Sequence, residues 1–281
     1  MSSPSPASPP LKLVCPGCRH VDASGELHVS VLEVDSAHVL RCLACERRYP
    51  VVDEVPIVLA DLESWLETER IAVLARDLPA DLSALLTRGS SVLNRDAHLR
   101  RVFEYAGGEL PDRIQGLVGE LSGEILDLGC GPGMHPRTDT VGLELNFALA
   151  RAFPGRGVVG DAADPPFLAH SFDAVLAINL LDSCPDPRTV LGQADALLRP
   201  GGTLILACPY AWDPELTPLE RQFEATDLLA ALSGDPASLG LRFNYELDLV
   251  EDRVSWRLQQ GSRTVQEHAC QLIVARKLGE A

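Results

Sequence analysis

The stretch Ile125-Leu-Asp-Leu-Gly-Cys-Gly-Pro-Gly133 decides the fold of this chain. Its apolar residues predict a buried β-strand that carries Asp127 near its end. The three glycines that follow predict a tight turn, because a backbone without Cβ atoms can bend sharply and approach a ligand. The spacing is G-x-G-x-G rather than the dinucleotide fingerprint G-x-G-x-x-G, since Met134 stands where the third glycine of that fingerprint would fall.

Four more strand-like segments follow in order. They are residues 141–144, residues 157–167 as a strand with a polar turn, residues 171–181, and residues 197–208 as a turn into a strand; helical patterns alternate with them. This alternation predicts an α/β fold with a parallel sheet and helices on both faces. Ligands of such sheets bind beyond the carboxyl ends of the strands. We therefore expect Asp127, Glu144, Asp161 and Asn179, which all fall at such ends, to surround one ligand site.

The order of these motifs resembles the class I S-adenosylmethionine (SAM) methyltransferases. The resemblance implies a Rossmann-like, seven-stranded methyltransferase domain over residues 123–281, with the last strand (268–277) inserted antiparallel beside the sixth. A carboxylate at Glu144 can accept hydrogen bonds from both ribose hydroxyls, and the turn at Asp161 is implied to hold the adenine amino group. The predicted cofactor-binding residues are Asp127, Gly129, Gly131, Gly133, Glu144, Asp161, Ala162 and Asn179.

Two C-x-x-C pairs precede this domain. The four thiols of Cys15, Cys18, Cys42 and Cys45 suit a closed tetrahedral Zn²⁺ site, which predicts a structural zinc ribbon. Residues 11–60 resemble the small zinc-ribbon activator subunit of several tRNA, rRNA and protein methyltransferases. Two interpretations stay open for this module: a folding staple, or a surface that recognises the acceptor or a protein partner.

A narrower resemblance covers residues 123–220. Asn179-Leu-Leu-Asp182 and Pro209-Tyr-Ala-Trp212 are similar to segments of the ovothiol-type 4-mercaptohistidine N-methyltransferase family. The similarity ends at residues 220–226, where that family carries a different segment. Asp182 and Tyr210 are our candidate catalytic residues: Asp182 can orient or deprotonate an acceptor nitrogen, while Tyr210 and Trp212 can wall the acceptor pocket.

The segment between the two modules, residues 61–122, is predicted to be a helical linker or lid. One amphipathic pattern includes Trp65, and a second includes Leu99, Val102, Phe103 and Tyr105. Trp65 and Tyr105 are interpreted as core residues or as parts of a lid. The segment after the glycines is unusually short, with no room for a full helix before residue 141. Either the cofactor site has degenerated, or His135 and Arg137 replace the contacts that such a helix would make.

Composition limits the partners. The chain has 281 residues with 40 acidic and 24 basic side chains, giving a formal charge of −16, which argues against nucleic acid. Residues 1–10 are rich in Ser and Pro and predict a disordered tail, and no apolar run reaches the ~20 residues that span a bilayer. We expect a cytoplasmic enzyme that methylates a small-molecule or peptide side-chain acceptor at a heteroatom. A SAM-fold scaffold that binds a partner and an RNA methyltransferase are the alternatives.

Overall fold

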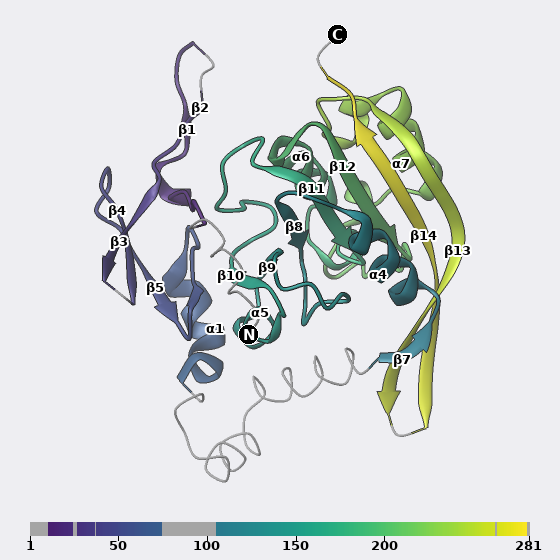
Figure 1. Ribbon diagram of the computed structural model, residues 1–281, viewed down its shortest axis with the longest axis horizontal. Coiled ribbons are helices and arrows are strands. Elements are labelled where there is room, and N and C mark those ends of the chain that lie inside the picture. The colour runs from purple at the N-terminus through teal and green to yellow at the C-terminus, as the bar shows by residue number, and fades with distance from the viewer. Residues whose placement is uncertain (1–10, 25–26, 37, 75–104, 262, 280–281) are drawn as a thin grey trace, which may run out of the picture.

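Figure 1 shows a computed structural model of the chain, which describes residues 11–24, 27–36, 38–74, 105–261 and 263–279. A large sheet with helices on both faces forms one part, and the cysteine module, residues 11–60, lies against one edge of it. The predicted tail at residues 1–10 and the predicted helical residues Leu99, Val102 and Phe103 lie outside the described residues. Within the described ranges, no helix has the length and apolar character to cross a membrane.

The large part is built on one mixed sheet of eight strands in the order β10-β9-β8-β11-β12-β14-β13-β7. The first five strands pair in parallel, and each later strand pairs antiparallel with its neighbour. The strands are β7 (Tyr105–Gly108), β8 (Ile125–Leu128), β9 (Val141–Glu144), β10 (Arg156–Val159), β11 (Phe172–Ile178), β12 (Leu198–Cys208), β13 (Tyr245–Gly261) and β14 (Thr264–Lys277).

The sheet has one strand more than the seven predicted. β14 lies antiparallel between β12 and β13, as the sequence predicts for the C-terminal strand. The additional strand is β7, which pairs with β13 at the sheet edge and begins at Tyr105, a residue that the apolar pattern wrongly placed in a helix. Gly107 and Gly108 adopt φ angles of 110° and 115°, outside the helical region, and a Cβ at Gly108 would meet the carbonyl oxygen of Ser255.

Helices cover both faces of the sheet because its central strands are apolar on both sides. Leu126 and Leu128 of β8 share a core with α6 and α7, while Ile125 packs with α4 on the opposite face. The helices are α1 (Leu62–Leu74), α4 (Leu110–Glu120), α5 (Phe147–Ala152), α6 (Pro187–Leu197) and α7 (Ala225–Ser233). The short 3₁₀ turns are η1 (Pro16–Cys18), η3 (Leu181–Ser183), η4 (Leu219–Arg221) and η5 (Pro236–Leu239).

The cysteine module consists of short antiparallel strands. A four-stranded sheet has the order β3-β4-β5-β6, and a separate hairpin, β1–β2, stands away from the body (Figure 1). The strands are β1 (His20–Val21), β2 (Leu27–His28), β3 (Leu32–Ser36), β4 (Val39–Cys42), β5 (Arg48–Val52) and β6 (Val55–Pro56).

The cysteine module covers the β10 edge of the large sheet. Ile57, just after β6, forms a parallel bridge with Val159 of β10, and the Val58 N–H donates to the Val159 carbonyl at 2.9 Å. A second contact joins Leu13 to Phe167 by an antiparallel bridge. Apolar packing of Ile57 and Leu59 with Val159 accompanies these hydrogen bonds. The module thus pairs backbone groups that an open sheet edge would leave exposed.

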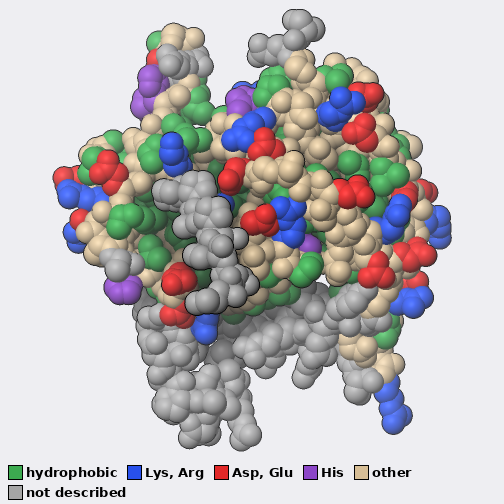
Figure 2. Space-filling view, in the orientation of Figure 1, with side chains coloured by type: hydrophobic (Ala, Val, Ile, Leu, Met, Phe, Trp, Pro, Cys, Tyr) green, Lys and Arg blue, Asp and Glu red, His purple; other side chains and the backbone are tan. Residues whose placement is uncertain are grey.

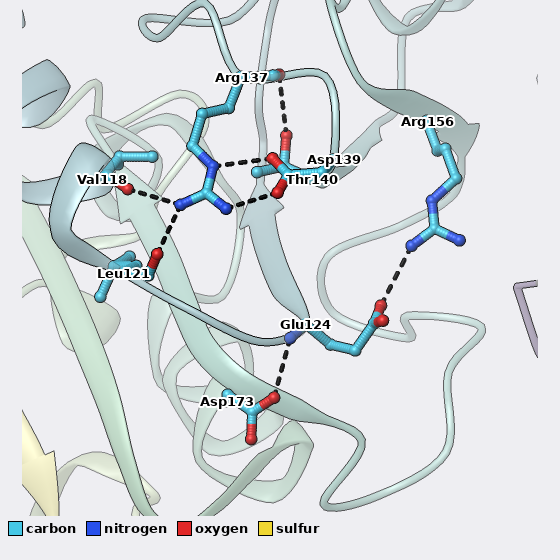
Figure 3. Close-up of polar contacts among 8 residues, drawn as sticks. All are labelled: Val118, Leu121, Glu124, Arg137, Asp139, Thr140, Arg156 and Asp173. Carbon is cyan, nitrogen blue, oxygen red and sulfur yellow. Dashed lines mark hydrogen bonds and ion pairs between the residues drawn. The ribbon is translucent and has the colours of Figure 1, made fainter. Parts of the chain in front are cut away.

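The loop after the glycine turn contains no helix. Residues 129–140, all of them described, run as turns and bends from β8 to β9. Figure 3 shows how Arg137 fixes this loop: its guanidinium donates to the carbonyls of Val118 and Leu121, at 2.9 and 2.7 Å, and pairs with Asp139. Arg137 therefore caps the C-terminal end of α4, where carbonyls lack helical partners. This assignment corrects the interpretation of Arg137 as a ligand contact.

Replacing Arg137 should destabilise the protein. Arg137→Ala leaves the Leu121 carbonyl without its donor and the Val118 carbonyl with only the Leu121 N–H, so the free energy of unfolding should fall by about 1–2 kcal/mol. Urea unfolding followed by circular dichroism measures this change. Arg113→Ala is the matched control, because this arginine of α4 makes only an exposed ion pair with Glu251 and should cost less than about 0.5 kcal/mol. Equal losses in the two variants would contradict the capping role.

Candidate active site

The glycine turn is held onto the end of β9 by backbone hydrogen bonds. The N–H groups of Gly129 and Cys130 both donate to the carbonyl of Leu143, at 2.8 and 3.1 Å. Gly129 and Gly131 adopt φ angles of 65° and 52°, in the left-handed region that glycine tolerates best. The turn predicted from the sequence is therefore present, with its amide groups at the carboxyl ends of β8 and β9.

Glu144 joins the turn to the next helix. One carboxylate oxygen accepts the N–H of Gly131 at 3.0 Å, and the other accepts the N–H of Asn146 at 3.0 Å. Burial raises the pKa of Glu144, and these backbone donors oppose that shift. Trp65 of α1 donates its indole N–H to the carbonyl of Leu145 at 2.8 Å and is buried, so it packs in the core beside this site.

Asp127 is deeply buried beside a histidine. Nε2 of His135 lies 3.5 Å from Oδ2 of Asp127, and neither ring nitrogen of His135 has a hydrogen-bond partner among the described residues. The His135 ring packs edge-on against Phe153. Burial raises the pKa of the Asp127 carboxyl, and His135 opposes the shift. The described contacts of the buried His135 are thus with Asp127 and Phe153.

The turn after β10 carries Asp161 and Ala162. Oδ1 of Asp161 accepts the N–H of Ala163 at 2.8 Å, which fixes the turn, while the Asp161 side chain stays exposed. Arg19 of the cysteine module reaches this turn: its guanidinium pairs with Asp164 and donates to the carbonyl of Pro165. The sequence reasoning missed Arg19, although its position directly after Cys18 was a signal that it extends from the cysteine knuckle.

Two further candidates follow the ends of β11 and β12 with strained backbones. Asn179 has φ 53° and Tyr210 has φ 54°, values that are uncommon for residues with a Cβ and that cluster at functional sites. Oδ1 of Asn179 lies 3.5 Å from the Cys270 thiol. Its Nδ2 is buried and has no hydrogen-bond partner within the described residues, so it is a free donor just after β11, the strand that pairs with β8.

Asp182 and Tyr210 lie at the same end of the sheet. Oδ2 of Asp182 accepts the N–H of Ala211 at 2.9 Å, and the hydroxyl of Tyr210 donates to Oε1 of Gln271 at 2.6 Å. Burial raises the pKa values of both groups, and the backbone donor opposes the shift at Asp182. Gln271 was missed, although a polar side chain inside the apolar strand 270–275 was a usable signal.

Aromatic side chains surround the candidate acceptor residues. Tyr210, Trp212 and Phe223 pack edge-on or tilted, with ring centroids 5.3–6.3 Å apart. The indole nitrogen of Trp212 is buried without a hydrogen-bond partner in the described structure. Trp212 is therefore both a packing residue and an unused donor beside Tyr210.

The four cysteines of the two C-x-x-C pairs come together. Their sulfur atoms all lie within 4.8 Å of one another, with Cys15 to Cys45 at 3.7 Å and Cys18 to Cys42 at 3.6 Å. Tetrahedral zinc with bonds of about 2.3 Å requires sulfur separations near 3.8 Å, so the donor set fits that ion. The hydroxyl of Tyr49 lies 3.1 Å from the Cys15 sulfur and supports it from the core.

The burial of Asp182 predicts a pH-dependent stability difference. Because the folded state raises its pKa above the unfolded value of about 3.9, Asp182 contributes stability at low pH that is lost as the pH rises through the folded pKa. Asp182→Asn keeps an oxygen for the Ala211 N–H but does not titrate. Wild type should therefore lose stability relative to this variant as the pH rises above the unfolded value of about 3.9, measured by urea unfolding over a series of pH values. A constant difference would contradict the burial argument.

Comparison with known proteins gives one family match. Residues 126–206, from the second residue of β8 to β12, match the model of a methyltransferase domain. O-methyltransferase cnsE of Penicillium expansum is 28% identical over 176 residues, covering 50% of this chain and 64% of that protein. The 27-O-demethylrifamycin SV methyltransferase of Amycolatopsis mediterranei (strain S699) is 34% identical over 122 residues, covering 37% and 45%. The chain thus spans less than two thirds of these relatives.

Similar solved structures are remote. A SAM-dependent methyltransferase from Methanosarcina mazei has 21% identity and a TM-score of 0.41, covering 58% of this chain and 97% of that one. Phosphoethanolamine N-methyltransferase 2 of Haemonchus contortus, in complex with S-adenosyl-L-methionine, has 13% identity and a TM-score of 0.42, covering 64% and 54%. The domain match and the curated relatives thus show similarity to methyltransferases over the segment that contains β8 to β12.

Proposed function

We propose that this protein is a SAM-dependent methyltransferase that acts on a small-molecule or peptide side-chain acceptor at a heteroatom. One observation carries the proposal: the segment matching the methyltransferase domain contains the glycine turn, Glu144 and Asn179, all at the carboxyl ends of adjacent parallel strands. Relatives such as O-methyltransferase cnsE favour a small-molecule acceptor and an oxygen among the possible heteroatoms.

The polar groups at this end fit SAM. Glu144 uses one acceptor position on each oxygen for the backbone, which leaves two positions for the ribose hydroxyls. Asn179 Nδ2 is a buried donor without a partner among the described residues, so a ligand acceptor atom would satisfy it. Asp127 and the glycines form the part that would hold the methionine end, and Asp161 and Ala162 the part that would hold the adenine. SAM supplies the methyl group.

The acceptor would lie between Asp182 and Tyr210. The buried carboxylate of Asp182 has a raised pKa and one oxygen not used by Ala211, so it can accept a proton from the acceptor heteroatom at Oδ1. The Tyr210 hydroxyl is held by Gln271 and kept protonated by burial. With Trp212 and Phe223 it excludes water and aligns the acceptor, which is the main demand of methyl transfer.

A second function is favoured by one observation, the loop at residues 129–140. The N-terminus of a helix at this position would offer free N–H groups to an anionic ligand group. This chain has no such helix there, and Arg137 is committed to α4. A SAM-fold scaffold that no longer binds the cofactor and serves a protein partner is therefore the alternative.

Titration calorimetry with S-adenosylhomocysteine separates these two functions. Wild type should bind it at micromolar concentration, and Glu144→Ala should weaken binding roughly ten- to hundredfold, since hydrogen bonds to a charged group are lost. Glu124→Ala is the matched control, because this acid lies before β8 at the opposite end of the sheet and pairs with Arg156 at 3.1 Å. Absence of binding at millimolar ligand would reject the enzyme in favour of the scaffold.

We propose that Zn²⁺ occupies the four-cysteine cluster. We also propose that the bound zinc fixes the position of Arg19, which in turn holds the turn at Asp161. Metal analysis should give one zinc per chain, and Cys18→Ser with Cys45→Ser should remove it. Arg19→Ala should keep the zinc and weaken S-adenosylhomocysteine binding about three- to tenfold, because Asp164 and Pro165 lose their partner.

The control for Arg19 is Arg48→Ala, which breaks an ion pair with Asp35 inside the module and should change neither zinc content nor affinity. A zinc-free wild-type protein with unchanged stability would contradict the metal site. Unchanged affinity in Arg19→Ala would contradict the coupling while leaving the metal site intact.

A further inference from the structure

A large groove separates the β1–β2 hairpin from the body of the molecule. Its volume is about 1280 Å³, and it lies along α6. The hairpin contributes Leu27 and the residue after it, Val29, to one side; α6 contributes Arg188 and Gly192, and Arg242 precedes β13 on the other side. Figure 2 shows the notch between the hairpin and the body. None of the predicted cofactor or acceptor residues lines it, and it meets the candidate active site only at Arg19 and Asp164, behind the turn that carries Asp161.

The charged side chains of the groove are mostly basic in a strongly acidic protein. Four arginines line it against two aspartates, and the two aspartates are already paired: Asp164 with Arg19 and Asp186 with Arg221. Arg188 and Arg242 are exposed and have no ion-pair partner in the described part of the chain. The groove therefore carries a local excess of positive charge, although the whole chain has a formal charge of −16.

Arg188 and Arg242 are held in place by the backbone beneath them. Asp195 of α6, fully buried, accepts the backbone N–H of Arg242 at 2.8 Å. Gly240 lies against the first turn of α6, so close that a Cβ there would meet the Arg188 carbonyl. The backbone that carries the two arginines is therefore fixed on one wall of the groove, so both side chains extend from defined positions.

Apolar side chains and an open strand edge complete the groove. Leu27 is 53% exposed and Leu278 is 41% exposed, and both line it together with Phe243. Among the described strands, β2 pairs only with β1, so its outer edge has backbone groups available for another strand. An extended peptide can add to such an edge by main-chain hydrogen bonds while its side chains enter neighbouring apolar sites.

We propose that this groove binds an acidic, extended peptide segment of a partner protein. Acidic side chains of the peptide would pair with Arg188 and Arg242, its apolar side chains would contact Leu27 and Phe243, and its backbone would pair with β2. A nucleic acid fits less well, because the excess of positive charge is confined to a few side chains and the surrounding protein is acidic. This binding does not depend on the methyltransferase function.

Fluorescence anisotropy with the full zinc-loaded chain tests the proposal. The probe is a fluorescein-labelled decapeptide of alternating glutamate and leucine, compared with the lysine–leucine decapeptide and a decathymidine oligonucleotide. The double variant Arg188→Ala, Arg242→Ala should weaken binding of the acidic peptide about tenfold, and Leu27→Ser should also weaken it. Both arginines are exposed, so the variants should keep their fold.

The matched control is the double variant Arg257→Ala, Arg263→Ala, which removes the same charge from exposed residues of β13 and of the turn before β14. It should bind the acidic peptide as wild type does. Equal loss of affinity in both double variants would mean that general charge, not the groove, attracts the peptide. Absence of acidic-peptide binding at millimolar protein, or preference for the oligonucleotide, would overturn the proposal.

Discussion

The carbonyl of Leu143 is the constraint on which the candidate site depends. It accepts N–H groups from both Gly129 and Cys130, so the turn after β8 is fastened to the end of β9 rather than to a helix of its own. Glu144, the next residue, accepts the following turn amide from Gly131. Because the loop up to residue 140 has no helix, these three hydrogen bonds define where the turn amides point. Strand β9 therefore orients the amides of the glycine turn, a role that a helix could have in a protein with a longer loop.

Arg137 fixes the later part of this short loop. A loop of few residues can close only if its ends are fixed, and Arg137 attaches it to the C-terminal carbonyls of α4. α4 in turn packs with Ile125 of β8, the strand that starts the glycine turn. The shortened loop is thus attached to β9 at its start and to α4 near its end, so both parts are fixed without secondary structure of the loop itself.

Much of the architecture could be predicted from the sequence, because apolar strands and glycine turns are local signals. The glycine turn after Leu128, the succession of strands β8 to β12 along the chain with their parallel pairing, and the antiparallel insertion of β14 follow from such patterns. β7 could not be predicted, since a four-residue strand with two glycines resembles a linker and is defined only by its pairing with β13. Arg19 and Gln271 reach the candidate site through contacts with Asp164 and Tyr210. These partners are far away in the sequence, so the spacing of motifs along the chain does not reveal the contacts.

The bridge between Ile57 and Val159 joins two parts of one chain, so its formation does not depend on protein concentration. The cysteine module and the large sheet belong to one chain, so their contact is unimolecular and is governed by an effective local concentration rather than by the amount of protein in solution. Dilution cannot separate the two parts, and a free second subunit would have to compete with a covalently tethered one. The fraction of molecules in which the module covers the β10 edge is consequently the same at any protein concentration.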